Sequence, residues 1–214
     1  MSKINIEEYV NLLKEQNSPQ SEFVKFTEKY GTPYTVLITC ILSLRTNDKT
    51  TYGAALRLLE LGKTPKEIAG CDLETIEKAI YPVGFYKNKA KQILELSKEL
   101  VEKYNSNVPN SIEELTKFKG VGRKTANLVI AKGFHEPAIC VDVHVHRICN
   151  RWGYVNTKKP DDTEMELRKI LPKKFWMDFN TLLVTHGQNG CKPTKPNCSI
   201  CKLNKLCAQK HYSN

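Results

Sequence analysis

The chain has 214 residues, which is enough for one or two compact domains with a sizeable hydrophobic core. Its 33 lysine and arginine residues exceed its 23 aspartate and glutamate residues, so the formal net charge is +10 and a polyanion is the expected partner. The longest uncharged stretch, residues 30–44, is too short to cross a bilayer, and residues 1–10 contain no apolar signal region. We therefore expect an intracellular protein, cytoplasmic if its source is a prokaryote.

Apolar residues recur at the spacing of helical turns along most of the chain, and no segment alternates as a strand would. Glycine, proline and asparagine break this pattern into roughly ten short helices with tight connections. The predicted fold class is therefore all-α, and residues 30–44 are typical of a buried helix. The clearest apolar faces lie in residues 6–13, 73–80, 93–100, 126–130 and 145–152.

A glycine turn between two predicted helices occupies the middle of residues 111–134. Ser111 and Glu114 have the spacing of a capping box for the first helix, and Gly120 and Gly122 precede the second. Glycines allow positive φ and leave backbone N–H groups uncovered near a helix amino terminus, so the turn could hold a phosphate. It could also be a plain connection between helices, but it lies within an uninterrupted basic cluster: Lys117, Lys119, Arg123, Lys124 and Lys132.

The spacing around this turn excludes two nucleotide-binding motifs. A Walker loop needs a lysine directly after the glycine, but Arg123 intervenes. A dinucleotide fingerprint needs a third glycine where Thr125 stands, and it follows a strand that is not predicted here. Free nucleotides are therefore not the expected ligands.

Lys124 is predicted in the first turn of the second helix. The helix dipole and the neighbouring charges of Lys119 and Arg123 disfavour an ammonium group there. A lysine so placed can supply a neutral amine that attacks an electrophilic carbon, as Schiff-base lysines do. The alternative is a solvated side chain that contacts a phosphate.

Asp142 immediately precedes the apolar face of residues 145–152, so it is a candidate helix N-cap. Capping alone would explain an aspartate at this position. A carboxylate kept ionised by backbone donors could also stabilise a cationic, oxocarbenium-like sugar or act as a base beside a lysine nucleophile. The sequence leaves these roles open.

Four cysteines, spaced C-x6-C-x2-C-x5-C, lie in a tail that holds five lysines and no acidic residue over residues 179–214. Thiols this close in an intracellular protein favour a metal site over disulfides. The spacing alone leaves both zinc and an iron–sulfur cluster open. The remaining cysteines, expected to be small buried hydrophobic residues, are Cys40, Cys71, Cys140 and Cys149.

Three segments in this order and at these separations resemble the endonuclease III family: GVGRKTANLV, VDVHVHR and the four-cysteine tail. Supporting likeness comes from VLITCILSLRTND, YPVGFYKNKA and LLVTHGQNGC, so the resemblance covers nearly the whole chain. It implies the helix-hairpin-helix DNA glycosylase fold, with two helical lobes and a DNA-binding cleft between them. A six-helix barrel would span residues 24–136 and include the hairpin of 111–134. Residues 1–23 and 137–214 would form a discontinuous domain with a [4Fe–4S] cluster.

The resemblance also implies a bifunctional DNA glycosylase and apurinic/apyrimidinic (AP) lyase of base-excision repair. Lys124 would be the nucleophile and Asp142 its carboxylate partner. The substrates would be oxidised pyrimidines in double-stranded DNA, which a monomer would excise through a Schiff base before cutting the strand by β-elimination. The cluster ligands would be Cys191, Cys198, Cys201 and Cys207.

Further DNA contacts follow from the same resemblance. Phe85 matches an intercalating wedge, although core packing is an alternative, and Arg45 matches a residue that fills the gap opposite the estranged base. Arg45 departs from the glutamine that is frequent in bacterial members, and Val143 departs from a usual threonine after Asp142. A third departure is Lys119, which replaces a frequent proline. The remaining DNA-contact positions that the resemblance implies are Lys119, Gly120, Val121, Gly122, Arg123, Lys192 and Lys195.

Two rival functions remain open at this point. One is a mismatch-specific glycosylase of the same superfamily that removes thymine or uracil opposite guanine, although such relatives commonly lack a lysine at the position of Lys124. The other is a non-catalytic protein that binds damaged DNA. The presence of both Lys124 and Asp142 argues against it.

Overall fold

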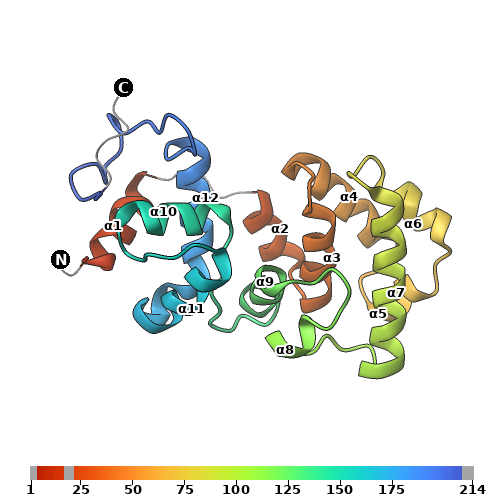
Figure 1. The fold of residues 1–214 in the computed structure, drawn as a ribbon. Helices are drawn as coiled ribbons and strands as arrows, with labels where there is room; N and C mark the ends of the chain where they lie inside the picture. Colours follow the sequence, from red (N-terminus) through yellow and green to blue (C-terminus); the bar gives the residue numbers. More distant parts are fainter. Residues whose placement is uncertain (1–3, 17–21, 209–214) are drawn as a thin grey trace. The chain divides into compact units, whose positions relative to one another are not determined.

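The computed structural model describes residues 4–16 and 22–208, which fold into helices joined by short turns (Figure 1). No strand occurs in these two ranges, in agreement with the predicted all-α class. The chain divides into two compact units. We call residues 22–136 the central unit, and residues 1–21 with 137–214 the terminal unit. None of the described helices is long and apolar enough to cross a membrane.

The central unit is built around one almost wholly buried helix, α3, which confirms the buried helix predicted in this region. Thr32 caps its start together with Thr35, and Pro33 occupies its first turn, where a missing N–H costs nothing. Helix α9 packs along α3, which also contacts α4 and α7 (Figure 1). The helices of this unit are α2 (Glu22–Tyr30), α3 (Pro33–Ser43), α4 (Asp48–Leu61), α5 (Pro65–Ala69), α6 (Leu73–Ile80), α7 (Tyr86–Tyr104), α8 (Ile112–Leu115) and α9 (Arg123–Gly133).

The terminal unit joins the first helix of the chain to its last segment. The buried face of α1 packs on α12 in one apolar core, and the rings of Tyr9 and Trp152 meet edge to face with centroids 4.8 Å apart. The Tyr9 hydroxyl donates to the Leu206 carbonyl, so α1 also contacts the tail. The helices here are α1 (Ile6–Gln16), α10 (Val143–Trp152), α11 (Pro160–Ile170), the 3-10 helix η1 (Lys173–Phe175) and α12 (Trp176–Asn189).

Two local predictions were wrong. Ser111 does cap α8, but the Glu114 carboxylate bonds to Lys117 and Tyr104, so the reciprocal half of the expected capping box is not formed. Cys71 is only half-buried, because it lies in the turn after α5, where its thiol donates to the Glu67 carbonyl. The other three cysteines outside the array, Cys40, Cys140 and Cys149, are buried as expected.

Candidate functional site

The predicted hairpin is formed by α8, a tight turn and α9. Gly120 has φ +76°, and a Cβ there would lie 2.5 Å from the Gln92 amide nitrogen, which donates to the Lys119 carbonyl at 2.7 Å. Glycine is therefore required at this point of the turn. Gly122 has an ordinary φ of −91°, and a Cβ there would meet no described atom within 4 Å. The fold does not demand glycine at Gly122, so its bare backbone is available to a close ligand.

Val121 anchors the turn to the interior of the central unit. Its side chain is buried, and its N–H donates to the Phe118 carbonyl at 3.0 Å, so this group is already used by the turn. Lys119, in contrast, is exposed beside it. The positive surface of the hairpin therefore comes from side chains around Val121 and from the start of α9, rather than from Val121 itself.

Lys124 lies in the first turn of α9, as predicted, and its side chain is exposed. The buried thiol of Cys40 on α3 is close enough to respond to the Lys124 charge. Burial raises the pKa of Cys40 to about 12, although the charge of Lys124 acts in the opposite direction. The thiol therefore stays protonated at neutral pH and does not compete with the lysine as a nucleophile.

Asp142 is the N-cap of α10, which confirms that prediction. Its Oδ1 accepts from the N–H groups of His144 and Val145, each at 2.9 Å. Both bonds fall on one oxygen, so Oδ2 has no hydrogen bond within the described part of the chain. Val143 begins α10 with 65% of its surface exposed, leaving an apolar surface beside the carboxylate.

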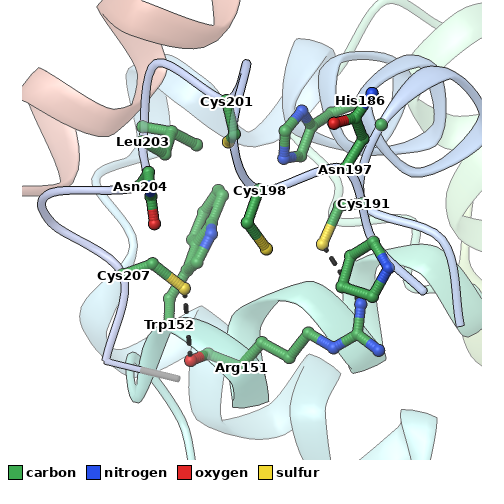
Figure 2. A pocket seen from close by; sticks show the side chains of 12 residues that line it. Arg151, Trp152, His186, Cys191, Asn197, Cys198, Cys201, Leu203, Asn204 and Cys207 are labelled. Atoms are coloured by element: carbon green, nitrogen blue, oxygen red, sulfur yellow. Dashed lines mark hydrogen bonds between the residues drawn. The ribbon is translucent and has the colours of Figure 1, made fainter. Parts of the chain in front are cut away.

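The four cysteines of the tail line one pocket, together with Trp152, His186 and Leu203 (Figure 2). All four are half-buried and none forms a disulfide. Burial raises the pKa of Cys201, and the charges of the other three sulfur atoms raise it further, which places the four within electrostatic reach of one another. No group of described histidine, cysteine, aspartate and glutamate side chains is compact enough to hold a single metal ion.

Two arginines of α10 anchor the start of this cysteine loop. Arg151 donates to the Cys191 sulfur at 3.3 Å and to the carbonyls of Lys192 and Pro193, each at 2.6 Å. Arg147 donates to the Cys191 carbonyl at 2.8 Å. Neither arginine was predicted as a functional residue, although Arg151 follows Ile148 by three positions and therefore lies at the edge of the apolar face of α10. Lys192 and Lys195, in the same loop, are exposed.

Arg45 and Phe85 lie on neighbouring turns of the central unit. Phe85 is 61% exposed, so the alternative of core packing is wrong. The Arg45 guanidinium carbon lies 5.8 Å from the centroid of the Phe85 ring. The structure therefore brings these two predicted contact residues together on the surface.

Residues 38–173 match the family described as HhH-GPD superfamily base excision DNA repair protein. The endonuclease III of Thermotoga maritima is 47% identical to this chain over 175 residues, which cover 82% of each protein. The chain belongs to the endonuclease III family. A DNA glycosylase and AP lyase activity in base-excision repair is therefore the activity of this protein.

Solved structures agree with this family assignment. One, described as a non-covalent endonuclease III–DNA complex, is 33% identical, covers 98% of this chain and 96% of its own, and has a TM-score of 0.84. Another, described as a trapped endonuclease III–DNA covalent intermediate with an estranged adenine, is also 33% identical, covers 96% and 97%, and has a TM-score of 0.78. The helix-hairpin-helix glycosylase fold predicted from the sequence is confirmed.

The endonuclease III family carries an iron–sulfur cluster, and the donor set in this chain fits one. Iron–sulfur clusters are held by cysteine thiolates, and four such side chains face a common pocket (Figure 2). Arg151 supplies a positive charge and an N–H donor to one of the sulfur atoms. His186 is 2% exposed in the wall of the pocket, and its Nδ1 has no partner among the described residues. Burial, with the charge of Arg147, lowers the pKa of His186 to about 4, so the imidazole is neutral.

Proposed function

We propose that this protein excises oxidised pyrimidines from double-stranded DNA, with Lys124 as the nucleophile. The observation that carries the proposal is the exposed Lys124 side chain in the first turn of the hairpin helix, among basic residues suited to the DNA backbone. The target sugar carbon is unreachable inside the base stack, so the damaged nucleotide must first be flipped out of the duplex.

The proposed chemistry proceeds in two stages. The neutral Lys124 amine attacks C1′, the glycosidic bond breaks with its electron pair on the base, and the departing base is protonated. Ring opening then gives a Schiff base between Nζ and C1′. Loss of a proton from C2′ allows the C3′–O bond to break, which releases the 3′ phosphate by β-elimination. Water finally hydrolyses the imine and frees the lysine.

In this proposal Asp142 is the carboxylate that assists these proton transfers. Its Oδ1 is held in place by two backbone N–H groups of α10, so the carboxyl group has a fixed orientation. The ionised carboxylate would offset positive charge that develops on the sugar and accept a proton from the attacking amine. A single aspartate would then cap a helix with one oxygen and serve the reaction with the other.

We further propose that the contacts with DNA lie in both units. The hairpin residues Lys119, Gly120, Gly122 and Arg123 would bind the DNA backbone, and the exposed Lys192 and Lys195 would bind other backbone phosphates. Phe85 and Arg45 would occupy the space that the flipped nucleotide leaves. The protein would act on DNA as a monomer, in the cytoplasm if its source is a prokaryote.

The terminal unit is the proposed cluster domain, with a [4Fe–4S] cluster held by Cys191, Cys198, Cys201 and Cys207. When bound, the cluster would supply structural support rather than hydrolytic chemistry. Arg151 holds the start of the cysteine loop through the carbonyls of Lys192 and Pro193, so this part of the loop is fixed to α10.

Replacing Cys198 by alanine tests the ligand assignment. We expect iron content to fall from about four atoms per chain to near zero, with loss of the visible absorption of the cluster, because three thiolates no longer enclose it. Cys71→Ala is the matched control, since Cys71 lies in the central unit, and it should retain full iron content. Iron at the wild-type level in the Cys198 variant would remove this cysteine from the ligand set.

The function itself is tested by borohydride trapping on a duplex that contains a single thymine glycol. Borohydride reduces an imine to a stable amine, so a lysine Schiff base becomes a covalent protein–DNA band. We expect a band of one protein chain per duplex, with the linkage at Lys124 by peptide mapping. Base release without a trapped band would instead indicate a monofunctional glycosylase, and binding without base release would indicate a protein that only recognises damage.

A further inference from the structure

Two adjacent turns of the central unit hold exposed side chains in an unfavourable backbone conformation. Arg45 has φ 53° and Phe85 has φ 59°, in the left-handed region that residues with a Cβ rarely adopt. Phe85 is also the N-cap of α7, yet its side chain makes no capping hydrogen bond. A serine, aspartate or glycine would suit that position better. Such a conformation persists only where the surrounding structure holds it in place.

The two turns touch each other at Gly84. Its N–H donates to the Thr46 hydroxyl at 3.2 Å, and a Cβ on Gly84 would lie only 2.9 Å from the Arg45 carbonyl oxygen. Glycine at this position lets the backbones approach closely. The approach also brings the Arg45 guanidinium over the Phe85 ring. Arg45 and Phe85 therefore form one surface feature, although they are 40 residues apart in the sequence.

Lys89 lies beneath this feature and bonds to both turns. Its side chain is 6% exposed, and its ammonium donates to the Leu42 carbonyl at 2.8 Å, to the Leu44 carbonyl, and to the Thr46 hydroxyl at 3.2 Å. The first two acceptors are carbonyl groups at the end of α3, which lack partners within the helix. The Lys89 backbone N–H donates to the Phe85 carbonyl at 3.1 Å. One residue thus reaches both of the unusual positions.

Burying an ammonium group costs free energy unless hydrogen bonds compensate for its lost hydration. Lys89 falls on the apolar face of α7, four residues before Ile93. A hydrophobic side chain there would avoid the desolvation of a charge. Burial lowers the pKa of Lys89 to about 8, so the group remains mostly charged at neutral pH. Its three acceptors lie at the end of α3 and in the turn after it, which carries Arg45. We infer that the buried charge stabilises the conformation of this turn.

We propose that Lys89 is a positioning residue that locks the Arg45 and Phe85 turns into one preformed element for insertion into DNA at a damaged base pair. The inference rests on the proposed DNA contacts of Arg45 and Phe85. Preorganisation spares the protein the entropy of ordering two loops when it opens the stack. Binding to undamaged DNA, which depends on backbone phosphates, does not need this element.

Lys89→Met tests this inference, because methionine keeps much of the side-chain volume and removes all three donors. We expect the ratio of affinities for a duplex with an uncleavable abasic-site analogue and for the same undamaged duplex to fall roughly tenfold. Affinity for the undamaged duplex should stay within experimental error. The matched control is Lys91→Met on the same helix, where the side chain is 68% exposed and its ion pair with Glu95 spans 3.8 Å. This control should leave the ratio unchanged.

A thermodynamic cycle separates positioning from general damage to the fold. If Lys89 acts through the two turns, Lys89→Met should cause no further loss of the ratio in a variant that already carries Arg45→Ala and Phe85→Ala. A full additional loss in that background, or an equal loss of affinity for both duplexes, would overturn the inference. If Arg45→Ala with Phe85→Ala does not itself lower the ratio, the proposed DNA contacts fail and Lys89 has nothing to position.

Gly84→Ala provides the second variant in case Lys89→Met does not fold. It leaves the buried ammonium in place but pushes the two turns apart, since the new Cβ would collide with the Arg45 carbonyl. We expect the same selective loss of affinity for the abasic-site duplex. An unchanged ratio in a folded Gly84→Ala variant would show that the spacing of the turns is irrelevant, and it would overturn the inference as well.

Discussion

Replacing Lys124 by glutamine should lower strand cleavage by about a thousandfold or more. Glutamine keeps the side chain polar and nearly as long, but an amide nitrogen does not attack C1′ or form an imine. Single-turnover cleavage of a thymine glycol duplex measures this rate, and the borohydride-trapped band should disappear with it. Affinity for a duplex with an uncleavable abasic-site analogue should change little, because one of several basic contacts is lost.

The control for this variant is Lys98→Gln, which removes the same charge from an exposed position on α7. It should cleave at the wild-type rate. If the Lys124 variant cleaves at the wild-type rate, Lys124 is not the nucleophile and its role is reduced to a phosphate contact. A large loss of binding with a proportionate loss of cleavage would lead to the same conclusion.

Asp142→Asn should slow turnover by roughly a hundredfold to ten thousandfold while the protein stays folded. Asparagine is a good N-cap, and its carbonyl oxygen can accept the same two N–H bonds from His144 and Val145. It cannot accept a proton or carry negative charge in the reaction. The turnover rate with an abasic-site duplex and a thermal melting curve, measured on the same preparation, separate the two roles.

Asp142→Ala completes this comparison because it removes both the cap and the carboxylate. It should lose as much activity as Asp142→Asn and in addition about 1 kcal/mol of stability. If Asp142→Asn keeps full turnover, or if it unfolds like the alanine variant, the aspartate is chiefly a cap and the proton transfers belong to another group.

Local sequence signals predicted much of the fold. The apolar spacing of Ile6, Tyr9, Val10 and Leu13 matches the buried face of α1, and the same holds for the face of α10. The uncharged stretch of residues 30–44 contains α3, the most buried helix of the central unit. These predictions succeeded because periodicity and caps depend on neighbours within one or two turns of the chain.

Contacts between distant residues were not predictable in this way. Lys89 bonds to a turn 43 to 47 residues earlier, and Arg151 bonds to a loop 40 to 42 residues later. Each looks like an ordinary basic residue of a surface helix until the partner segments are brought together. The family motifs located the candidate site, but they did not reveal which buried charges support it. The catalytic roles of Lys124 and Asp142 remain predictions.

The order of the helices along the chain has a consequence for biosynthesis. The central unit is one continuous segment, whereas the apolar face of α1 has its partners in α12 and near Leu206, close to the other end of the sequence. During translation the central unit can therefore fold as it leaves the ribosome. The apolar face of α1 can be buried only after α12 has been synthesised. A nascent chain with its tail still in the ribosome would hold a folded hairpin but an unfinished cysteine pocket. Insertion of the proposed cluster would then follow the folding of the central unit.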